Sequence, residues 1–168
     1  GIPIEAIIIF NDTADWAAEL QVATYVLAGG RPLGCGGDPK SGHFGQAAKV
    51  FCSNSDFVWQ AKYPAVRYGQ GAFLQCLRAL WLQYSGQELC VSEFGKPQKV
   101  QFETAHQIMK AKSAHLRRLY MIGDNPAADI RGANQAGEPW RSVLVCTGVY
   151  RGGPLENDLA DPAWRVEK

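Results

Sequence analysis

Residues 119–133 read Leu-Tyr-Met-Ile-Gly-Asp-Asn-Pro-Ala-Ala-Asp-Ile-Arg-Gly-Ala, a passage from an apolar run through Gly-Asp into a helix. The four apolar residues that open this stretch are typical of a strand buried on both faces, as parallel strands under helices are. Pro126 suits the first turn of a helix, so the pattern predicts a helix from about Pro126 to Gln135. The junction between the strand and the helix carries two carboxylates, Asp124 and Asp129.

These two acids are expected at the edge where an open α/β sheet binds its ligands, the carboxyl ends of the parallel strands. Two carboxylates without an adjacent lysine suit a hard, oxygen-seeking cation such as Mg²⁺. An Asp before a helix is, however, most often a cap, and an Asp in the first turn complements the helix dipole. A metal site therefore depends on what else reaches the same edge.

The segments around this junction predict an α/β fold. Strands are expected at residues 4–10, 49–52, 89–94, 119–122 and 141–147, with a short one near 164–166, and helices at 15–27, 72–84, 100–115 and 126–135. From residue 89 onward the order is β-α-β-α-β, which predicts one parallel sheet with right-handed crossovers. The helix at 72–84 is expected to carry its core-facing apolar residues on one face, namely Phe73, Leu77, Leu80 and Trp81. The helix at 100–115 is expected to bury Phe102, Ala105, Ile108 and Met109.

The composition is that of a globular protein. At 168 residues the chain is one ordinary domain or two small ones, and a hydrophobic content of 46% is enough for a core. The formal charge of +1, from 17 basic and 16 acidic residues, gives no field that would favour nucleic acid or an anionic membrane. The apolar runs are far shorter than the roughly 18 residues of a membrane span. We therefore expect neither a nucleic-acid partner nor a membrane span.

Two further features argue against other kinds of site. The five cysteines are odd in number and lack Cys-x-x-Cys spacing, so we expect reduced, buried thiols and an intracellular compartment. The glycine-rich residues 29–46 are expected to form a loop. Because no strand immediately precedes their Gly-x-Gly spacings and no helix immediately follows, a nucleotide-binding loop is disfavoured.

A lysine follows the strand expected at 89–94, in Gly95-Lys96-Pro97. By itself it is an ordinary loop lysine. If the strands at 89–94 and 119–122 lie near each other, its ammonium group converges with Asp124 and Asp129 on one crevice. A cation held by carboxylates beside a fixed ammonium group suits a phosphoryl group, because the cation and the lysine neutralise the phosphoryl oxygens. The joint pattern therefore favours phosphoryl chemistry.

This joint pattern resembles the haloacid dehalogenase (HAD) hydrolases. Gly95-Lys96-Pro97 looks like their third motif, and Gly123-Asp124-Asn125-x-x-x-Asp129-Ile130 with Gly132-Ala133 looks like their fourth. The strand ending in Cys146-Thr147-Gly148-Val149 is similar to that of class IIA, the subgroup of the p-nitrophenyl phosphatases and pyridoxal phosphatase. Three earlier segments are similar to that subgroup's large α/β cap: Phe10-Asn11-Asp12, Ser53-Asn54-Ser55-Asp56 and Gly69-Gln70-Gly71-Ala72.

Within class IIA the resemblance is greatest to the cat eye syndrome critical region protein 5 family. It is carried by Ser53-Asn54, Phe73-Leu74-x-Cys76-Leu77, Tyr120-x-x-Gly123-Asp124-Asn125-Pro126 and Leu144-Val145-Cys146-Thr147-Gly148-Val149-Tyr150. The resemblance implies a HAD-like Rossmannoid parallel sheet, present as a partial core, with a class IIA cap. On this basis residues 1–87 are assigned to the cap and residues 88–168 to the C-terminal part of the core.

The resemblance also implies a role for each candidate residue. Asp124 would be a magnesium ligand, Asp129 would support the metal site, and Lys96 would steady the phosphoryl group and the nucleophile. Asn54, Asp56 and Asn125 are candidates for lining the substrate site, although a plain turn explains residues 53–56 equally well. The implied reaction is Mg²⁺-dependent hydrolysis of a small phosphorylated substrate through an aspartyl-phosphate. The family resemblance further suggests mitochondria and a link to glycerophospholipid metabolism.

One departure from the family pattern concerns the nucleophile. Family members carry it in an Asp-x-Asp motif on the first core strand, before the cap, and this sequence contains no Asp-x-Asp. The chain is therefore expected to be a piece of a phosphatase. We expect the missing core segment to be supplied as another chain, or the strand edge at 119–122 to pair with a neighbouring molecule such as a second copy. The alternative is a non-catalytic binding or scaffold protein. A flavodoxin-like domain is disfavoured because it gives Lys96 and the acids no shared purpose.

Overall fold

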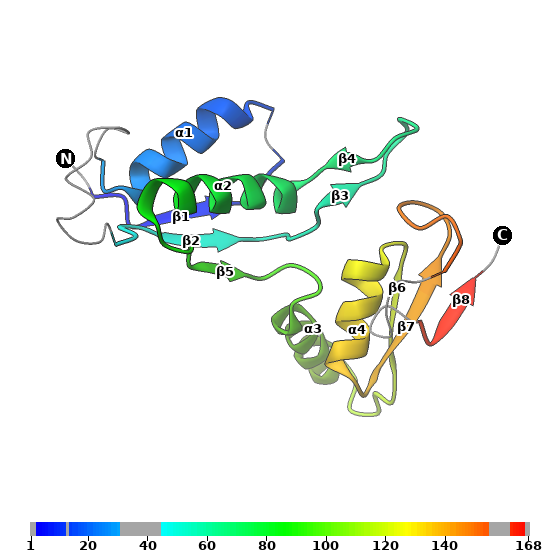
Figure 1. Cartoon of the computed structure of the whole chain (residues 1–168). Coiled ribbons are helices and arrows are strands. Elements are labelled where there is room, and N and C mark those ends of the chain that lie inside the picture. The colour runs from blue at the N-terminus through cyan, green and yellow to red at the C-terminus, as the bar shows by residue number, and fades with distance from the viewer. Residues whose placement is uncertain (1–2, 13, 31–44, 155–161, 167–168) are drawn as a thin grey trace. The chain divides into compact units, whose positions relative to one another are not determined.

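The computed structural model describes residues 3–12, 14–30, 45–154 and 162–166 (Figure 1). The chain divides into two compact units. Unit 1 comprises Gly1–Phe57 and Tyr68–Glu93, and unit 2 comprises Val58–Arg67 and Phe94–Lys168. The assignment of residues 1–87 to a cap and 88–168 to a core stays a prediction. The glycine-rich loop expected at 29–46 falls largely on residues 31–44, which lie outside the described residues.

Unit 1 is a parallel sheet with helices on one face. The strand order is β1 (Ala6–Ile9), β2 (Lys49–Cys52), β5 (Val91–Glu93), and both pairings are parallel. The helices are α1 (Trp16–Leu27) and α2 (Gln70–Ser85), both on the same side of the sheet (Figure 1). Helix α1 begins where the Asp15 carboxylate accepts a hydrogen bond from the Ala18 N–H at 3.1 Å, and α2 ends at Gly86, whose φ is 72°.

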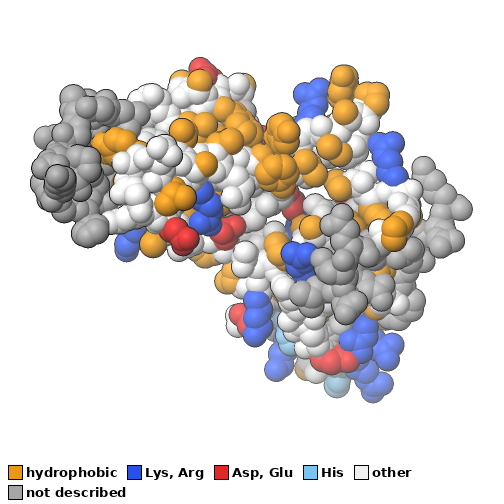
Figure 2. Space-filling view, viewed as in Figure 1, with side chains coloured by type: hydrophobic (Ala, Val, Ile, Leu, Met, Phe, Trp, Pro, Cys, Tyr) orange, Lys and Arg blue, Asp and Glu red, His pale blue; other side chains and the backbone are white. Residues whose placement is uncertain are grey.

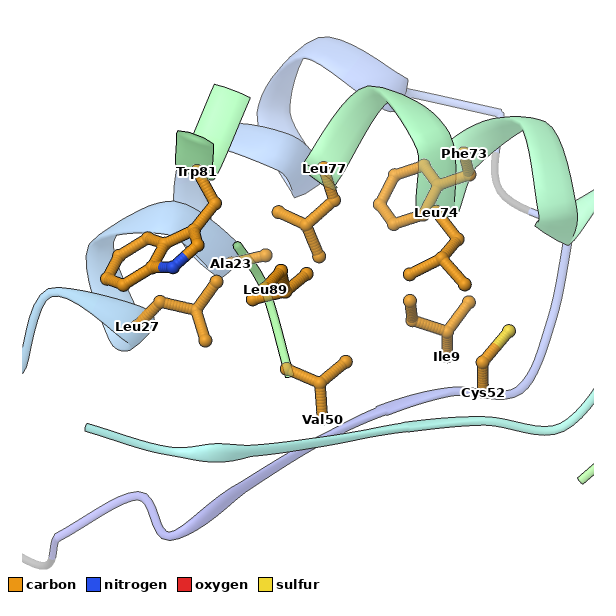
Figure 3. Packing of buried hydrophobic residues seen from close by; sticks show 10 residues of the cluster. All are labelled: Ile9, Ala23, Leu27, Val50, Cys52, Phe73, Leu74, Leu77, Trp81 and Leu89. Atoms are coloured by element: carbon orange, nitrogen blue, oxygen red, sulfur yellow. The ribbon is translucent and has the colours of Figure 1, made fainter. Parts of the chain in front are cut away.

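The core of unit 1 lies between these helices and the sheet. Figure 3 shows helix side chains meeting strand side chains there, and the buried set is Ile9, Ala23, Leu27, Val50, Cys52, Phe73, Leu74, Leu77, Trp81 and Leu89. Leu80 is not among them and is 45% exposed, so the expectation that it is buried is wrong. Leu77 and Trp81, four residues apart, already point the helix at the core, and Leu80 lies to one side of that line.

The position of β5 corrects the expected sheet. The sequence order predicted one sheet from residue 89 onward, but β5 pairs with β2, with Val50 opposite Val91 and Cys52 opposite Glu93. Buried Leu89 belongs to the core of unit 1, and the Gln46 side chain bonds the Cys90 backbone at 2.9 and 3.0 Å. These contacts tie β5 to unit 1, whereas the α/β alternation of the sequence cannot say which sheet a strand joins.

Unit 2 contains a second parallel sheet, in the order β6 (Leu119–Gly123), β7 (Trp140–Val145), β8 (Trp164–Val166). Its helices are α3 (Lys99–Lys112), the π-helical turn η1 (Pro126–Ile130) and α4 (Arg131–Ala136). Helices α3 and α4 lie side by side (Figure 1). The expected helix at 126–135 is therefore present with a π-helical first turn. A short hairpin of β3 (Val58–Trp59) and β4 (Arg67–Tyr68) was not expected from the sequence.

Helix α3 buries less than its pattern predicts. Phe102 is 3% exposed, but Ile108 and Met109 are 52% and 42% exposed, so the prediction for these two is wrong. The cysteine prediction also holds only in part. Cys52 is buried, Cys76 and Cys146 are partly buried and Cys90 is exposed, and these four thiols are free.

Several apolar side chains lie at the surface of the described residues (Figure 2). On β6, which is an edge strand of its sheet among the described residues, Tyr120 and Ile122 are 50% and 64% exposed. The prediction that another chain covers this edge stays a prediction. Within the described part of the chain, no helix has the length and apolar character that crossing a bilayer requires.

Candidate functional site

Among the described residues of unit 2, Asp129 is the acid that is buried. Asp129 is 3% exposed, and both of its carboxylate oxygens accept hydrogen bonds. Oδ1 accepts a hydrogen bond from the Lys96 ammonium at 2.5 Å, and Oδ2 accepts one from the Asn125 N–H at 3.0 Å. A buried carboxylate is tolerated when it is paired with a charge and its remaining lone pairs are hydrogen-bonded. The pair therefore fixes the lysine ammonium at the carboxyl end of β6.

The chain around Asp129 is shaped to admit this side chain. A Cβ on Gly123 would overlap the Asp129 carboxylate, so only glycine leaves it room at the end of β6. The Asn125 side-chain oxygen caps the next turn by accepting a hydrogen bond from the Ala127 N–H at 3.1 Å, and the Asn125 backbone carbonyl accepts one from the Asp129 N–H at 2.8 Å. The resulting turn is π-helical, a local geometry that is frequent at functional sites.

Lys96 reaches Asp129 through the packing of α3, not through a shared sheet. Phe102 packs edge-on against Trp140, with ring centroids 5.1 Å apart. Gly132 lies against the Phe102 ring: a Cβ there would overlap that ring and lie 3.1 Å from the Cα of Pro97. The start of α3 and the residues before it therefore approach α4 closely. Lys96 and Asp129 meet as predicted, but the neighbouring strands that the prediction assumed are not the cause.

Asp124 differs from Asp129 in how its carboxylate is used. It is partly buried, and its Oδ2 accepts a hydrogen bond from the Val149 N–H at 2.6 Å. Its backbone carbonyl accepts the Tyr150 N–H at 2.9 Å. Within the described residues, Asp124 Oδ1 makes no hydrogen bond. Asp124 therefore has one carboxylate oxygen that a backbone amide holds and one, called its open oxygen below, that has no hydrogen bond to the described residues.

Asn54 and Asp56 lie in unit 1, after β2. The Asn54 side-chain oxygen accepts the Asp56 N–H at 3.0 Å, a local turn of the kind that Asn commonly forms. Gly71 passes so close that a Cβ would lie 2.8 Å from the Asp56 backbone. The geometry of the Asn54 side chain is thus that of a turn, and a substrate role for either residue remains a proposal.

Cys52, two residues before Asn54, does not carry a reactive thiol. Cys52 is fully buried at the end of β2, and its Sγ donates to the Asn54 carbonyl at 3.2 Å. Burial raises the pKa of the Cys52 thiol above its ordinary value, which keeps it protonated at neutral pH. Nucleophilic chemistry at Cys52 is therefore not indicated.

In the structure, Lys96 and the Asn125 backbone N–H each contact Asp129, and Asp124 directly precedes Asn125 in the chain. The structure also adds two positions that the sequence analysis quoted but assigned no role, Gly148 and Val149. The signal for them was a Thr-Gly pair directly after a buried strand, which without coordinates reads only as a turn.

The donor set at this edge fits a magnesium ion. No cluster of three or more His, Cys, Asp or Glu side chains occurs in the described residues, so an all-protein cage is not present there. Mg²⁺ does not need one, since it keeps several waters and is usually bound through one or two carboxylates plus substrate phosphate. Asp124, with its open oxygen, supplies the kind of donor that such a site uses.

The sequence itself matches known proteins over most of its length. Residues 93–168 match the model of the HAD-hydrolase-like family. A cardiolipin synthase (CMP-forming)/mitochondrial hydrolase fusion protein of Schizosaccharomyces pombe is 33% identical over 163 residues, which cover 89% of this chain and 25% of that protein. A mitochondrial hydrolase of Saccharomyces cerevisiae is 32% identical, over 89% of this chain and 48% of that protein.

Residues 93–168 belong to the HAD-hydrolase-like family. The predicted resemblance and the predicted α/β fold are therefore confirmed. A solved structure with a similar fold is the glycerol phosphate phosphatase of Mycobacterium tuberculosis in complex with magnesium, with a TM-score of 0.60 at 20% identity over 96% of this chain and 40% of that one. This HAD-like chain spans about half of the S. cerevisiae relative and a quarter of the S. pombe relative.

Proposed function

We propose that the whole protein is a Mg²⁺-dependent phosphatase that hydrolyses a small phosphorylated substrate. The observation that carries this proposal is that Lys96 is fixed on buried Asp129 at the end of β6, the strand that Asp124 directly follows. Family membership supports it, as does the name of a phosphatase with a similar fold. The substrate would bind with its phosphoryl group at this edge.

In this proposal each described residue has a separate task. Asp124 would hold the magnesium ion, which when bound supplies positive charge to the phosphoryl oxygens. Lys96 would neutralise charge that develops on a phosphoryl oxygen. Asp129 would not contact the substrate, because both its oxygens are occupied, and would keep Lys96 oriented. Asn125 would line the site beside them.

The nucleophile would be a carboxylate that these 168 residues do not supply, since they contain no Asp-x-Asp. Its oxygen would bond to phosphorus as the ester P–O bond breaks, and the alcohol would leave with a proton donated by the second acid of that motif. Water would then attack phosphorus, releasing phosphate and restoring the carboxylate. We propose that this carboxylate comes from a core segment of the whole protein or from another chain, and that Asn54 and Asp56 belong to the cap that selects the substrate.

The names of the relatives support a location and a substrate class. Both fungal relatives are called mitochondrial hydrolases, so we propose a mitochondrial location. One is fused to a cardiolipin synthase, and the solved structure is a glycerol phosphate phosphatase. A small phosphomonoester of glycerophospholipid metabolism is therefore the substrate class that we propose to test first.

Asp124→Asn tests the proposal. In the full-length protein we expect phosphate release from p-nitrophenyl phosphate with Mg²⁺, and at least about a 100-fold loss in the variant, because a neutral amide is a poor ligand for a hard cation. Asp124→Asn should keep its melting temperature, since Asn retains an oxygen for the Val149 N–H. A wild type that binds Mg²⁺ but releases no phosphate from any phosphomonoester supplied would favour the scaffold alternative.

A further inference from the structure

The loop after β7 holds Asp124 through two consecutive backbone amides. The Val149 N–H donates to the carboxylate Oδ2 at 2.6 Å, and the Tyr150 N–H donates to the Asp124 carbonyl at 2.9 Å. A hydrogen bond to an ionised acceptor is shorter and stronger than a neutral one. The two bonds together fix both the backbone and the side chain of this residue.

Gly148 allows the loop to come this close. A Cβ on Gly148 would overlap Asp124 Oδ2 and lie 2.8 Å from the carboxylate carbon. The backbone of Gly148 is not in the left-handed region, unlike that of Gly152, whose φ is 109°. Space for the carboxylate, and not backbone conformation, therefore requires glycine at this position.

Tyr150 anchors the other end of the loop. It is 8% exposed and packs with buried Ile130 and Leu144, and its hydroxyl donates to the Gly153 carbonyl at 2.5 Å. Ile130 directly follows Asp129 at the end of η1. The same small core thus supports the loop that holds Asp124 and the turn that carries Asp129.

We propose that the Gly148–Val149 turn is a positioning element that sets which oxygen of Asp124 is available to a cation. The Val149 amide occupies Oδ2 and restrains the carboxylate, and Oδ1 remains as the ligand atom. This inference rests on the proposed function, because it concerns the same metal. Removing groups that orient a metal ligand typically costs about 10- to 100-fold in metal affinity.

The test measures binding of Mn²⁺ and Mg²⁺ to the full-length protein, by electron paramagnetic resonance of free Mn²⁺ and by calorimetry. Gly148→Ala should bind both ions about 10- to 100-fold more weakly than the wild type. Two variants at the next residue form a matched pair. Val149→Ala keeps the amide N–H and should bind within about twofold of the wild type, whereas Val149→Pro removes the N–H and should lose affinity as Gly148→Ala does.

Kinetics add a readout that a general loss of structure would not produce. In Gly148→Ala the concentration of Mg²⁺ for half-maximal activity should rise with the dissociation constant. KM for p-nitrophenyl phosphate at saturating Mg²⁺ should change by less than about twofold, because the affected interaction is between the protein and the ion.

The outcomes separate this inference from the proposed function. A wild type that binds neither ion would overturn both. A wild type that binds, with Gly148→Ala and Val149→Pro equal to it, would overturn the positioning role alone. If near-ultraviolet circular dichroism shows that Gly148→Ala has lost its fold, the Val149 pair decides: weaker binding by the Pro variant than by the Ala variant supports the inference, and equal binding overturns it.

Discussion

The carboxyl edges of the two sheets both carry acidic and polar side chains. They differ in how many of the carboxylate oxygens have hydrogen-bond partners. In unit 1, Glu93 accepts hydrogen bonds from Ser55 at 2.6 Å and from Arg78 at 2.8 Å, and the Ser53 hydroxyl bonds Gln70 at 3.0 Å. In unit 2, both carboxylate oxygens of buried Asp129 likewise accept hydrogen bonds. In Asp124, five residues earlier, a backbone amide holds Oδ2, and Oδ1 has no hydrogen bond to the described residues.

This difference shows how polar residues at such an edge can be sorted. A network whose donors and acceptors satisfy one another stabilises the fold, and removing a member leaves a buried group without its partner. A carboxylate that is restrained through one oxygen can bind a ligand through the other without losing an existing hydrogen bond. The prediction from the sequence that both acids of unit 2 serve the metal therefore separates into a proposed ligand, Asp124, and a proposed support, Asp129.

The largest effect is expected from Lys96→Met. This change leaves the Asp129 carboxylate, whose side chain is 4% exposed, without its charged partner, and breaking such a pair costs about 3–5 kcal/mol of unfolding free energy. Phosphate release should also be lost. Denaturant titration of the full-length protein measures the change, and Lys110→Met, at an exposed position of α3, is the control that should stay within about 0.5 kcal/mol.

A double variant sharpens this result. Lys96→Met with Asp129→Asn removes both charges, so it should regain part of the stability that the single variant loses, while remaining inactive. Equal stability of wild type and Lys96→Met would contradict the view that the pair supports the fold of unit 2.

A smaller effect, confined to stability, is expected from Glu93→Gln in unit 1. The change weakens the bonds from Ser55 and Arg78 and should cost about 1–3 kcal/mol of unfolding free energy. Because Glu93 belongs to the closed network, Mg²⁺ affinity measured by calorimetry should be unchanged. A Glu93→Gln protein that is as stable as the wild type but binds Mg²⁺ more weakly would contradict the assignment of Glu93 to stability and not to metal binding.

The smallest effect is expected at the exposed pair of Glu138 and Arg141. The hydrogen bond from Arg141 lowers the pKa of the Glu138 carboxyl below its ordinary value. A carboxyl whose pKa is lowered by folding contributes stability above its unfolded pKa, and this contribution disappears as pH falls through the folded pKa. Melting temperatures of wild type and Glu138→Gln should therefore differ slightly at pH 7 and converge in acid. A difference that persists in acid would show that another interaction is responsible.

Much of the fold was predictable because its elements carry local signals. Residues 49–52 form a strand with the predicted bounds, and α1 and β6 lie within a residue or two of prediction. The misses have a common origin. Ile108 and Met109 follow helical spacing but find no packing partner that buries them, and the sheet that β5 joins is set by Leu89 and Gln46. The spacing of residues within a segment predicts neither outcome, because both depend on contacts with other segments.

The sequence by itself determined that the chain is a HAD-like α/β protein and that Lys96, Asp124 and Asp129 are its candidate residues. Strand and helix periodicity and motif spacing are properties of short segments, so they can be recognised from the sequence alone. Only the tertiary structure decided that Asp129 is saturated by Lys96 and Asn125 while Asp124 keeps an open oxygen. That distinction depends on contacts between residues far apart in the sequence, such as the 2.6 Å approach of the Val149 amide to Asp124, and close packing fixes those contacts.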